Sequence, residues 1–402
     1  MEAKPDLPAT SFSKSYLETL MAGVEEVRNG LSKIVRAAEA VVPRLAQGGD
    51  LYIASVRPDF TSEGYVRSGG LMMLKEYDPA REPSARDAVI VGWTGTEPDR
   101  DLALLRSLEN TGAFTVGIGP PVGDLAARAH VFLDSNLSLD PAVTGPFGDA
   151  AYPLVSLQNL LLLWTFTGEL TAALTRCGRM PALYQSVMVP GARERNGDLG
   201  TRRFHSSHGV PALSPQQLGG AYLDEIKNCL RTVCEREIEA IKQVARAGAE
   251  VWKSGHRIHA FLISHFPVHQ AGAPGDPKFM DPLYGGSAET PDLSALEKKL
   301  RPGDLFFFLG YYRRPVEAYE IVRRRKGQIV EIITGTDEPD PGGPLPDYII
   351  RPGWPYGDSL VPVPGYDIRI LPASGVLQTA IYWAVVGEMG QQLKSELKYQ
   401  EG

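Results

Sequence analysis

The sequence contains one pattern twice, and this duplication limits the possible folds more than any other feature. YLETLMAGVEEV from position 16 aligns with YLDEIKNCLRTV from position 222, an offset of 206. Further along, RDAVIVGW (86–93) aligns with PGDLFFFLG (302–310), so Asp87 matches Asp304 and the offset grows to 217. Near the ends, LLWTFTGEL (162–170) aligns with IYWAVVGEM (381–389). Three blocks in the same order predict two similar units in one chain.

Each unit alternates predicted helices and strands. The first unit predicts helices at 16–47, 61–75, 99–111, 122–129 and 152–176, and strands at 51–55, 88–92, 114–118 and 130–134. The second predicts a helix at 222–253, strands at 257–263, 304–309, 328–333 and 347–350, and a helix after Pro372. This alternation is typical of a mainly parallel sheet with helices on both faces. The unbroken apolar run AVIVG agrees, because parallel strands are buried on both faces.

We therefore predict an α/β protein with two three-layer α/β/α domains, arranged as an internal pseudo-dimer with mainly parallel sheets. Domain 1 spans residues 1–205 and domain 2 spans 206–402, joined through a linker at about 180–220 that is rich in Gly, Ser, Pro and Arg. The repeated Trp-x-x-x-Gly-Glu blocks predict helix packing shared by both units, with the Trp buried and the Gly allowing close approach.

Charge and cysteine content argue against several protein classes. The net charge of −7 disfavours a general nucleic-acid-binding protein. Three scattered cysteines are too few for a disulfide framework or a zinc site. The N-terminal MEAKPDLPATSFSK lacks the apolar run of a secretion signal, and LLLLWTF (160–166) is too short to span a bilayer. We expect a cytoplasmic protein that binds a small molecule, without a membrane, nucleic-acid or metal partner.

One loop carries a family resemblance. SARDAVIVGWTGTEPDRDLALLRSLENTGAFTVGIG (84–119) places Thr and Gly between a strand and a helix, at the sheet edge where helix N-termini bind anions. The segment resembles the core of the sugar isomerase (SIS) domain, whose members bind phosphosugars at strand-to-helix loops. Thr94 and Gly95 match the second Ser and the Gly of that family's SxSGxT loop, whereas Gly92 and Glu97 replace its first Ser and its Thr.

Two further segments extend the resemblance over nearly the whole chain. TSEGYVRSGGLMML (61–74) is similar to the AEExxYRAGG helix of one group of uncharacterised SIS proteins, which places Glu63 and Arg67 on that motif. IASVR (53–57) stands where those proteins have the phosphate-binding turn GTGHS, with Arg57 in place of a Ser. In the second unit, Tyr311 and Tyr312 occupy the Ser and Gly positions, so that loop is unsuited to the usual phosphate cradle.

The resemblance implies a sugar-phosphate ligand, and aldose–ketose isomerisation if the protein is an enzyme. The implied ligand-binding residues are Ser55, Arg57, Thr61, Ser62, Arg67, Thr94, Gly95 and Thr96. Glu63 is the candidate base, because a partly buried carboxylate can move a proton between adjacent carbons. His205 and His208 are the candidate acids for opening the sugar ring. This chemistry requires no cofactor, and the resemblance also implies a homodimer.

Each candidate has a simpler alternative. Thr96 or Glu97 could only cap the helix that begins near Pro98, and Glu63 could be a surface glutamate. His205 and His208 could form an exposed polar cluster in the linker. The rival function is a non-catalytic ligand sensor or scaffold. The isomerase hypothesis requires Arg57, Glu63 and Thr94 to line one cleft.

Two other site types are disfavoured. His259, His265 and His269 resemble metal ligands at first, but strand alternation would scatter them over both faces, which favours structural roles. VGIGPPVGDLAARAHVFLD (116–134) contains three glycines after a strand, but its loop is one residue longer than a dinucleotide-binding fingerprint and its acid comes too early.

Overall fold

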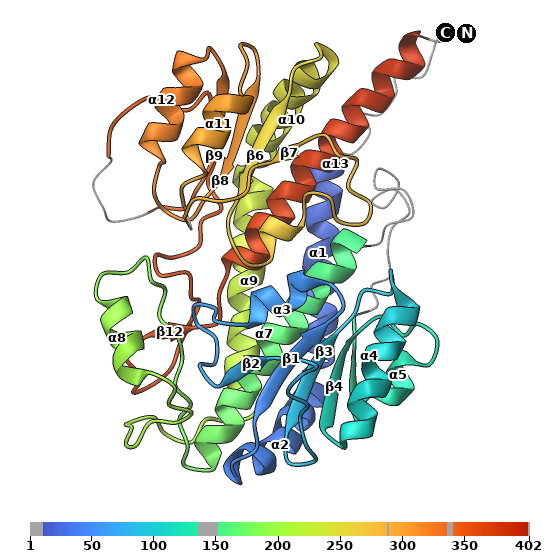
Figure 1. Ribbon diagram of the computed structural model, residues 1–402, viewed down its shortest axis with the longest axis vertical. Coiled ribbons are helices and arrows are strands. Elements are labelled where there is room, and N and C mark those ends of the chain that lie inside the picture. The colour runs from blue at the N-terminus through green and yellow to red at the C-terminus, as the bar shows by residue number, and fades with distance from the viewer. Residues whose placement is uncertain (1–10, 136–151, 288, 336–340, 401–402) are drawn as a thin grey trace.

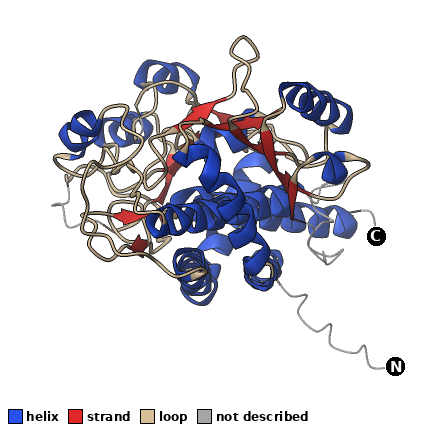
Figure 2. Ribbon diagram, turned by 90° about the horizontal axis from the view of Figure 1, so that it is seen from below, coloured by secondary structure: helices blue, strands red, loops and turns tan. Residues whose placement is uncertain are grey.

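The computed structural model describes residues 11–135, 152–287, 289–335 and 341–400. Residues 1–10, which carry most of the segment examined for a secretion signal, lie outside the described residues. Figure 1 shows two separate sheets, the second above the first, with long helices running beside both. In Figure 2 helices lie on both sides of the strands. Within the described part of the chain, no helix combines the length and apolar character needed to cross a bilayer.

The first sheet and its helices occupy the N-terminal part of the chain. The elements are α1 (Phe12–Asn29), α2 (Leu31–Ala46), β1 (Leu51–Ser55), α3 (Pro58–Gly64), β2 (Leu74–Glu76), β3 (Ala88–Gly92), α4 (Pro98–Thr111), β4 (Phe114–Gly119), α5 (Leu125–Arg128), β5 (Val131–Asp134) and α7 (Tyr152–Arg176). Helix α8 (Ala192–Leu199) lies within the predicted linker.

The second sheet and its helices follow. The elements are α9 (Gln217–Arg236), α10 (Ile238–Lys253), β6 (Ile258–Leu262), the 3-10 helix η2 (Pro267–His269), β7 (Asp281–Pro282), α11 (Leu293–Lys299), β8 (Leu305–Leu309), α12 (Val316–Arg324), β9 (Gln328–Ile332), β10 (Tyr348–Ile350), β11 (Val361–Pro362), β12 (Arg369–Ile370) and α13 (Ser374–Gln400). Strands β11 and β12 form a small antiparallel pair outside the two main sheets.

The two sheets have the same strand order, which confirms the predicted fold class. The first runs β2-β1-β3-β4-β5 and the second β7-β6-β8-β9-β10, and all neighbouring strands in both are parallel. The predicted match of Asp87 with Asp304 also holds in three dimensions. Asp87 accepts hydrogen bonds from the backbone N–H groups of Asp50 (2.6 Å) and Ser84 (2.7 Å). Asp304 accepts from Arg257 (2.9 Å) and Arg301 (2.7 Å) in the same arrangement.

Strand β3 shows why its sequence has no alternating pattern. Ala88 and Ile90 face the main core, whereas Val89 and Val91 pack in a second cluster with Leu105 and Leu108 of α4. Both faces of the strand are covered by helices, so each residue of AVIVG is apolar or glycine.

Three helix predictions were wrong in their bounds. The helix predicted at 61–75 is only the short α3, and Leu74–Glu76 instead forms the edge strand β2. Between them the chain turns sharply, with Gly69 at φ 71°. The predicted helix 16–47 divides at Gly30 into α1 and α2, and the predicted helix 222–253 divides at Glu237 into α9 and α10.

The Trp-x-x-x-Gly-Glu blocks connect the two halves reciprocally. Trp164 and Trp383 are buried, as predicted. A Cβ on Gly387 would lie 1.9 Å from the Phe12 ring, which confirms the close approach at that glycine.

The glutamates of these blocks have a role that the prediction did not include. Glu169, in α7, accepts hydrogen bonds from the backbone N–H groups of Gln216 and Gly219 at the start of α9, both 2.8 Å. Glu388, in α13, accepts from the backbone N–H of Ser13 at the start of α1 (2.9 Å). A glutamate in the last helix of each half therefore accepts hydrogen bonds from backbone N–H groups at the start of the first helix of the other half.

Candidate functional site

The carboxyl ends of β1 and β3 form one cleft at the edge of the first sheet. Strand β1 ends at Ser55 and the chain continues through Arg57 into α3, while β3 ends at Gly92 and leads through Thr94 into α4. Because β1 and β3 are neighbouring parallel strands, their following loops lie side by side. Arg57 and Thr94 both line the resulting cleft.

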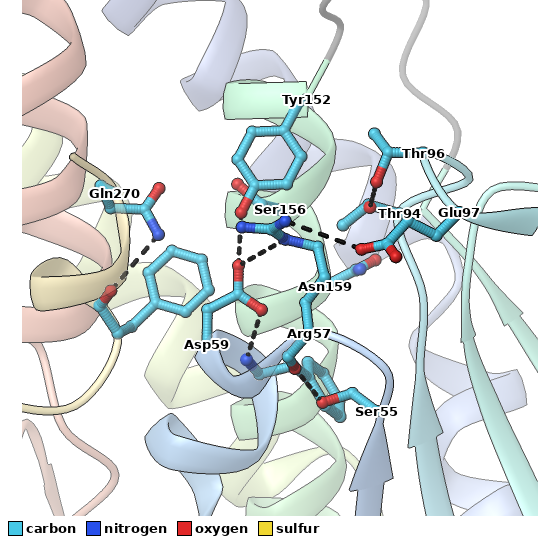
Figure 3. A network of polar contacts seen from close by, with 12 residues as sticks. Ser55, Arg57, Asp59, Thr94, Thr96, Glu97, Tyr152, Ser156, Asn159 and Gln270 are labelled. Atoms are coloured by element: carbon cyan, nitrogen blue, oxygen red, sulfur yellow. Dashed lines mark hydrogen bonds and ion pairs between the residues drawn. The ribbon is translucent and has the colours of Figure 1, made fainter. Parts of the chain in front are cut away.

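Arg57 is the central cation of this cleft (Figure 3). Its Nε lies 3.5 Å from Oδ2 of Asp59, and its Nη1 lies 3.8 Å from Oε1 of Glu97. Its guanidinium lies 5.2 Å from the centre of the Tyr152 ring, within cation–π range. The Tyr152 hydroxyl in turn donates a hydrogen bond to Asp59. The cation is thus fixed between two carboxylates and an aromatic ring.

The hydroxyl groups of the cleft pair with one another. The Ser55 hydroxyl lies 2.7 Å from the Thr61 hydroxyl and donates to the Arg57 carbonyl. Across the cleft, the Thr94 and Thr96 hydroxyls lie 2.9 Å apart. Gly95 between them has φ 77°, a conformation that favours glycine. The loop is held from α7, where the Asn159 side-chain amide donates to the Trp93 carbonyl (2.8 Å).

The start of α4 is not capped by a side chain. Glu97 occupies the N-cap position, but the carboxylate makes no capping hydrogen bond and instead pairs with Arg57 and Arg100. Neither Glu97 nor Thr96 therefore performs the simple capping role. This 14-residue helix begins beside the cleft, which Glu97 and Asp101 line, so its positive N-terminal end favours an anion there.

Asp101, in the first turn of α4, is a buried carboxyl group of this cleft. Burial, with a further contribution from the Glu97 charge, raises the pKa of Asp101 to about 7. Between about pH 4 and pH 7 the folded protein binds a proton here that the unfolded chain releases. The free energy of unfolding contributed by this group therefore falls as the pH rises through that window.

Asp101→Asn should remove this pH dependence, because the amide cannot ionise. We expect the variant to exceed the original protein in free energy of unfolding at pH 8, by about 4 kcal/mol at most, and to match it near pH 4. Urea unfolding at both pH values measures the difference. Asp99→Asn is the matched control, since Asp99 lies in the same turn and is exposed. Equal effects of Asp101→Asn at the two pH values would contradict the assignment.

Glu63 does not line this cleft. The carboxylate is completely buried, its Oε1 lies 3.3 Å from Nε of Arg67, and its Oε2 accepts the backbone N–H of Phe266 (3.1 Å). Arg67 is also bound to Asp358 (2.8 Å) and donates to the Ser374 hydroxyl. Burial raises the pKa of Glu63, against the opposing charge of Arg67. The network joins α3 to the second half of the chain.

The other predicted residues are distributed over three places. Thr61 belongs to the cleft's hydroxyl pair, whereas the Ser62 carbonyl accepts a hydrogen bond from Nδ1 of His265 in the second half. His205 contacts the Tyr366 hydroxyl through Nε2 (3.0 Å), and Nε2 of His208 lies 3.4 Å from the Gly178 carbonyl. Neither histidine lines the cleft with Arg57 and Thr94.

The corresponding loop of the second half is filled by the protein itself. Tyr311 and Tyr312, after β8, are buried and stack with ring centres 6.0 Å apart. The Glu289 carboxylate accepts the backbone N–H groups of Tyr312 (2.7 Å) and Arg313 (3.3 Å). A side-chain carboxylate thus occupies the N–H groups that a bound anion would need.

Sequence reasoning missed several polar residues at the first cleft: Asp59, Asp101 and Asn159 line it, and Tyr152 contacts Asp59 and Arg57. Asp59 follows Arg57 by two residues, so its proximity to that cation could have been anticipated. Tyr152 and Asn159 are seven residues apart on α7 and share a helix face. Only the fold brings that face to the cleft, and no local motif marks it.

Comparison with known proteins identifies similar folds but no similar sequence. No protein-family model and no curated protein matches the sequence. Among solved structures, the C-terminal domain of glucosamine-fructose-6-phosphate aminotransferase from Francisella tularensis is 11% identical, with 98% of each chain covered and a TM-score of 0.54. A protein from Salmonella typhimurium LT2 described as sugar-binding is 11% identical (TM-score 0.52), covering 96% of this chain and 98% of the other.

A third structure agrees with these two. It is a Clostridium difficile 630 protein assigned as a phosphosugar isomerase, 9% identical, with 96% of this chain and 93% of the other covered and a TM-score of 0.51. At such low identities the similarity defines the fold, and it extends over nearly the whole chain. The chain therefore has the tandem sugar-isomerase fold that its sequence predicted.

Proposed function

We propose that this protein binds a sugar phosphate at the cleft of the first sheet, without isomerising it. The observation that carries the proposal is the convergence of Arg57, the hydroxyls of Thr94 and Thr96, and the uncapped start of α4 on one cleft. A guanidinium, hydroxyl donors and helix N–H groups are the groups that bind phosphate in proteins.

Phosphate binding in this cleft depends on Glu97. The free volume inside the cleft is only about 10 Å³, and the Glu97 carboxylate lies against Arg57. Glu97 has a second partner in Arg100, to which it is already bound. The ligand's phosphate would replace Glu97 beside Arg57, while Glu97 keeps its contact with Arg100. Arg57 then forms an ion pair with the phosphate of the ligand in place of the one with Glu97.

The fold supports the sugar part of the ligand. Proteins with this fold include one described as sugar-binding and one assigned as a phosphosugar isomerase. Isomerisation is not supported by the position of Glu63, which is buried in an ion pair with Arg67 and lies outside the cleft. We therefore favour a non-catalytic protein in which the domains 1–205 and 206–402 act as one ligand-binding unit. We expect it to work in the cytoplasm.

A thermal-shift titration with a panel of sugar phosphates tests this proposal. We expect at least one sugar phosphate to raise the melting temperature, because a ligand that binds only the native state stabilises it. Arg57→Ala should abolish the shift, Thr94→Ala should reduce it, and Glu97→Gln should enlarge it by removing the competing carboxylate.

Arg106→Ala is the matched control, since Arg106 is exposed on α4 away from the cleft. A shift that survives Arg57→Ala unchanged would contradict the site. Conversion of a bound aldose phosphate to its ketose, lost in Glu63→Gln, would contradict the non-catalytic part of the proposal.

A further inference from the structure

A second cavity lies between the two halves and is separate from the cleft of the first sheet. Its volume is about 290 Å³. The lining comes from three parts of the chain: Val66–Ser68 after α3, residues 184–188 with Arg193 and Asn196 around α8, and Ser264, His265 and Tyr311 at the carboxyl ends of β6 and β8. A cavity near this size, built from separate segments with converging polar groups, is typical of a small-molecule site.

The charge of this cavity differs from that of the first cleft. Three carboxylates line the first cleft: those of Asp59, Glu97 and Asp101. Among the described residues that line the second cavity there is no carboxylate, and the Arg193 side chain makes no hydrogen bond or ion pair with them or with the rest of the described chain. Hydroxyls of Ser68, Ser186 and Ser264 add uncharged donors and acceptors. This cavity therefore favours a polar ligand with negative charge.

His265 supplies a hydrogen-bond acceptor. Its Nδ1 must carry the proton, because its partner at 2.9 Å is the Ser62 carbonyl, which only accepts. Burial, and then the Arg67 charge, lowers the pKa of His265 to about 3, so the ring is neutral at physiological pH. Nε2 consequently carries a lone pair, and within the described residues it has no hydrogen-bond partner. A ligand hydroxyl is a suitable donor to it.

Two of the seven non-glycine residues with positive φ in the described chain line this cavity. His265 has φ 71° and Val66 has φ 50°, both in the left-handed region. This conformation is unusual for histidine and a marked outlier for a β-branched valine. Such strain persists where the surrounding structure holds it, and it clusters at ligand sites. Two strained residues from different halves of the chain thus face one cavity.

We propose that this cavity is a second ligand site, which takes a small polyhydroxylated molecule carrying one anionic group. Arg193 binds the anionic group, and the serine hydroxyls with Nε2 of His265 bind the ligand hydroxyls. The loop N–H groups of the second half are not involved, because Glu289 already occupies them. The site does not depend on the proposed function of the first cleft.

The test separates the two sites by calorimetric titration of the full chain. The probes are glucose 6-phosphate, gluconate, glucose and inorganic phosphate. Arg57→Ala serves as the background, since it leaves the first cleft with uncompensated carboxylates that repel anions. In this background we expect glucose 6-phosphate or gluconate to bind more tightly than glucose or phosphate, which shows that hydroxyls and charge are both required. The first two probes identify which anionic group is preferred.

Adding Arg193→Ala to the background should weaken binding at least tenfold, whereas adding Arg106→Ala should leave it unchanged. Arg193 and Arg106 are both exposed helix residues, so either variant is expected to fold. Equal affinities with and without Arg193→Ala would overturn the proposal. So would loss of all binding in Arg57→Ala alone, an outcome that would leave the first cleft as the site. Absence of binding of all four probes to the unaltered protein would also overturn the second site, whereas the first cleft is tested separately by the panel of sugar phosphates.

Discussion

Replacing Arg67 by methionine will lower the free energy of unfolding by about 3–5 kcal/mol. Arg67 is only 2% exposed and lies between the carboxylates of Glu63 and Asp358, both completely buried. Removing the cation leaves two buried carboxylates without their counter-charge. Urea unfolding followed by circular dichroism measures the loss, and a loss below about 1 kcal/mol would contradict the buried network.

A second variant tests whether the unpaired charges cause the loss of stability. A triple variant, Arg67→Met with Glu63→Gln and Asp358→Asn, contains no unpaired charge. It should lose less stability than Arg67→Met alone, because replacing a whole buried ion cluster costs less than breaking it. A triple variant that is less stable than the single one would show that packing, rather than charge, dominates at Arg67.

The substitution Asp304→Ala will lower the free energy of unfolding by about 3 kcal/mol or more. The Asp304 carboxylate satisfies the backbone N–H groups of Arg257 and Arg301 and contacts Nε2 of buried His259 (3.1 Å). Alanine removes the partner of buried His259 and of two part-buried N–H groups, and an unsatisfied buried group costs about 1–3 kcal/mol. Chemical denaturation of the variant measures the sum.

Asp87→Ala is the matched comparison, because the duplication gives Asp87 the same place in the first half. Asp87 is more exposed, at 9% against 1% for Asp304, so water can replace more of its hydrogen bonds. We expect a smaller loss for Asp87→Ala. An equal or larger loss would show that the two positions do not differ in burial in the way the structure indicates.

The strands were predictable because their apolar residues are local information. Residues 51–55 and 88–92 form β1 and β3 with the predicted bounds. Strand β2, in contrast, has only one buried residue among its three, Leu74, and its position is set by pairing with β1. An edge strand of this kind carries little sequence signal, which explains why the segment was assigned to a helix.

The site was predictable only where its residues follow the strands directly. Arg57 and Thr94 lie next to strand ends, so sheet topology alone places them together. Glu63 lies within helix α3, and whether its side chain reaches the cleft or the second half depends on how α3 packs. Its contact with Phe266 joins residues 203 positions apart. No local pattern in the sequence encodes that contact.

The reciprocal glutamates have a consequence for synthesis of the chain. Helix α1 is synthesised well before the carboxylate that accepts the N–H at its start, because that carboxylate belongs to Glu388, 375 residues later than Ser13. At about 5–20 residues per second, a ribosome needs roughly 20–75 seconds to reach it. Once residue 205 has been made, the first half is complete in sequence yet still lacks a contact of its own first helix until Glu388 follows. The first half therefore obtains its full set of contacts only after Glu388 of the second half has been made.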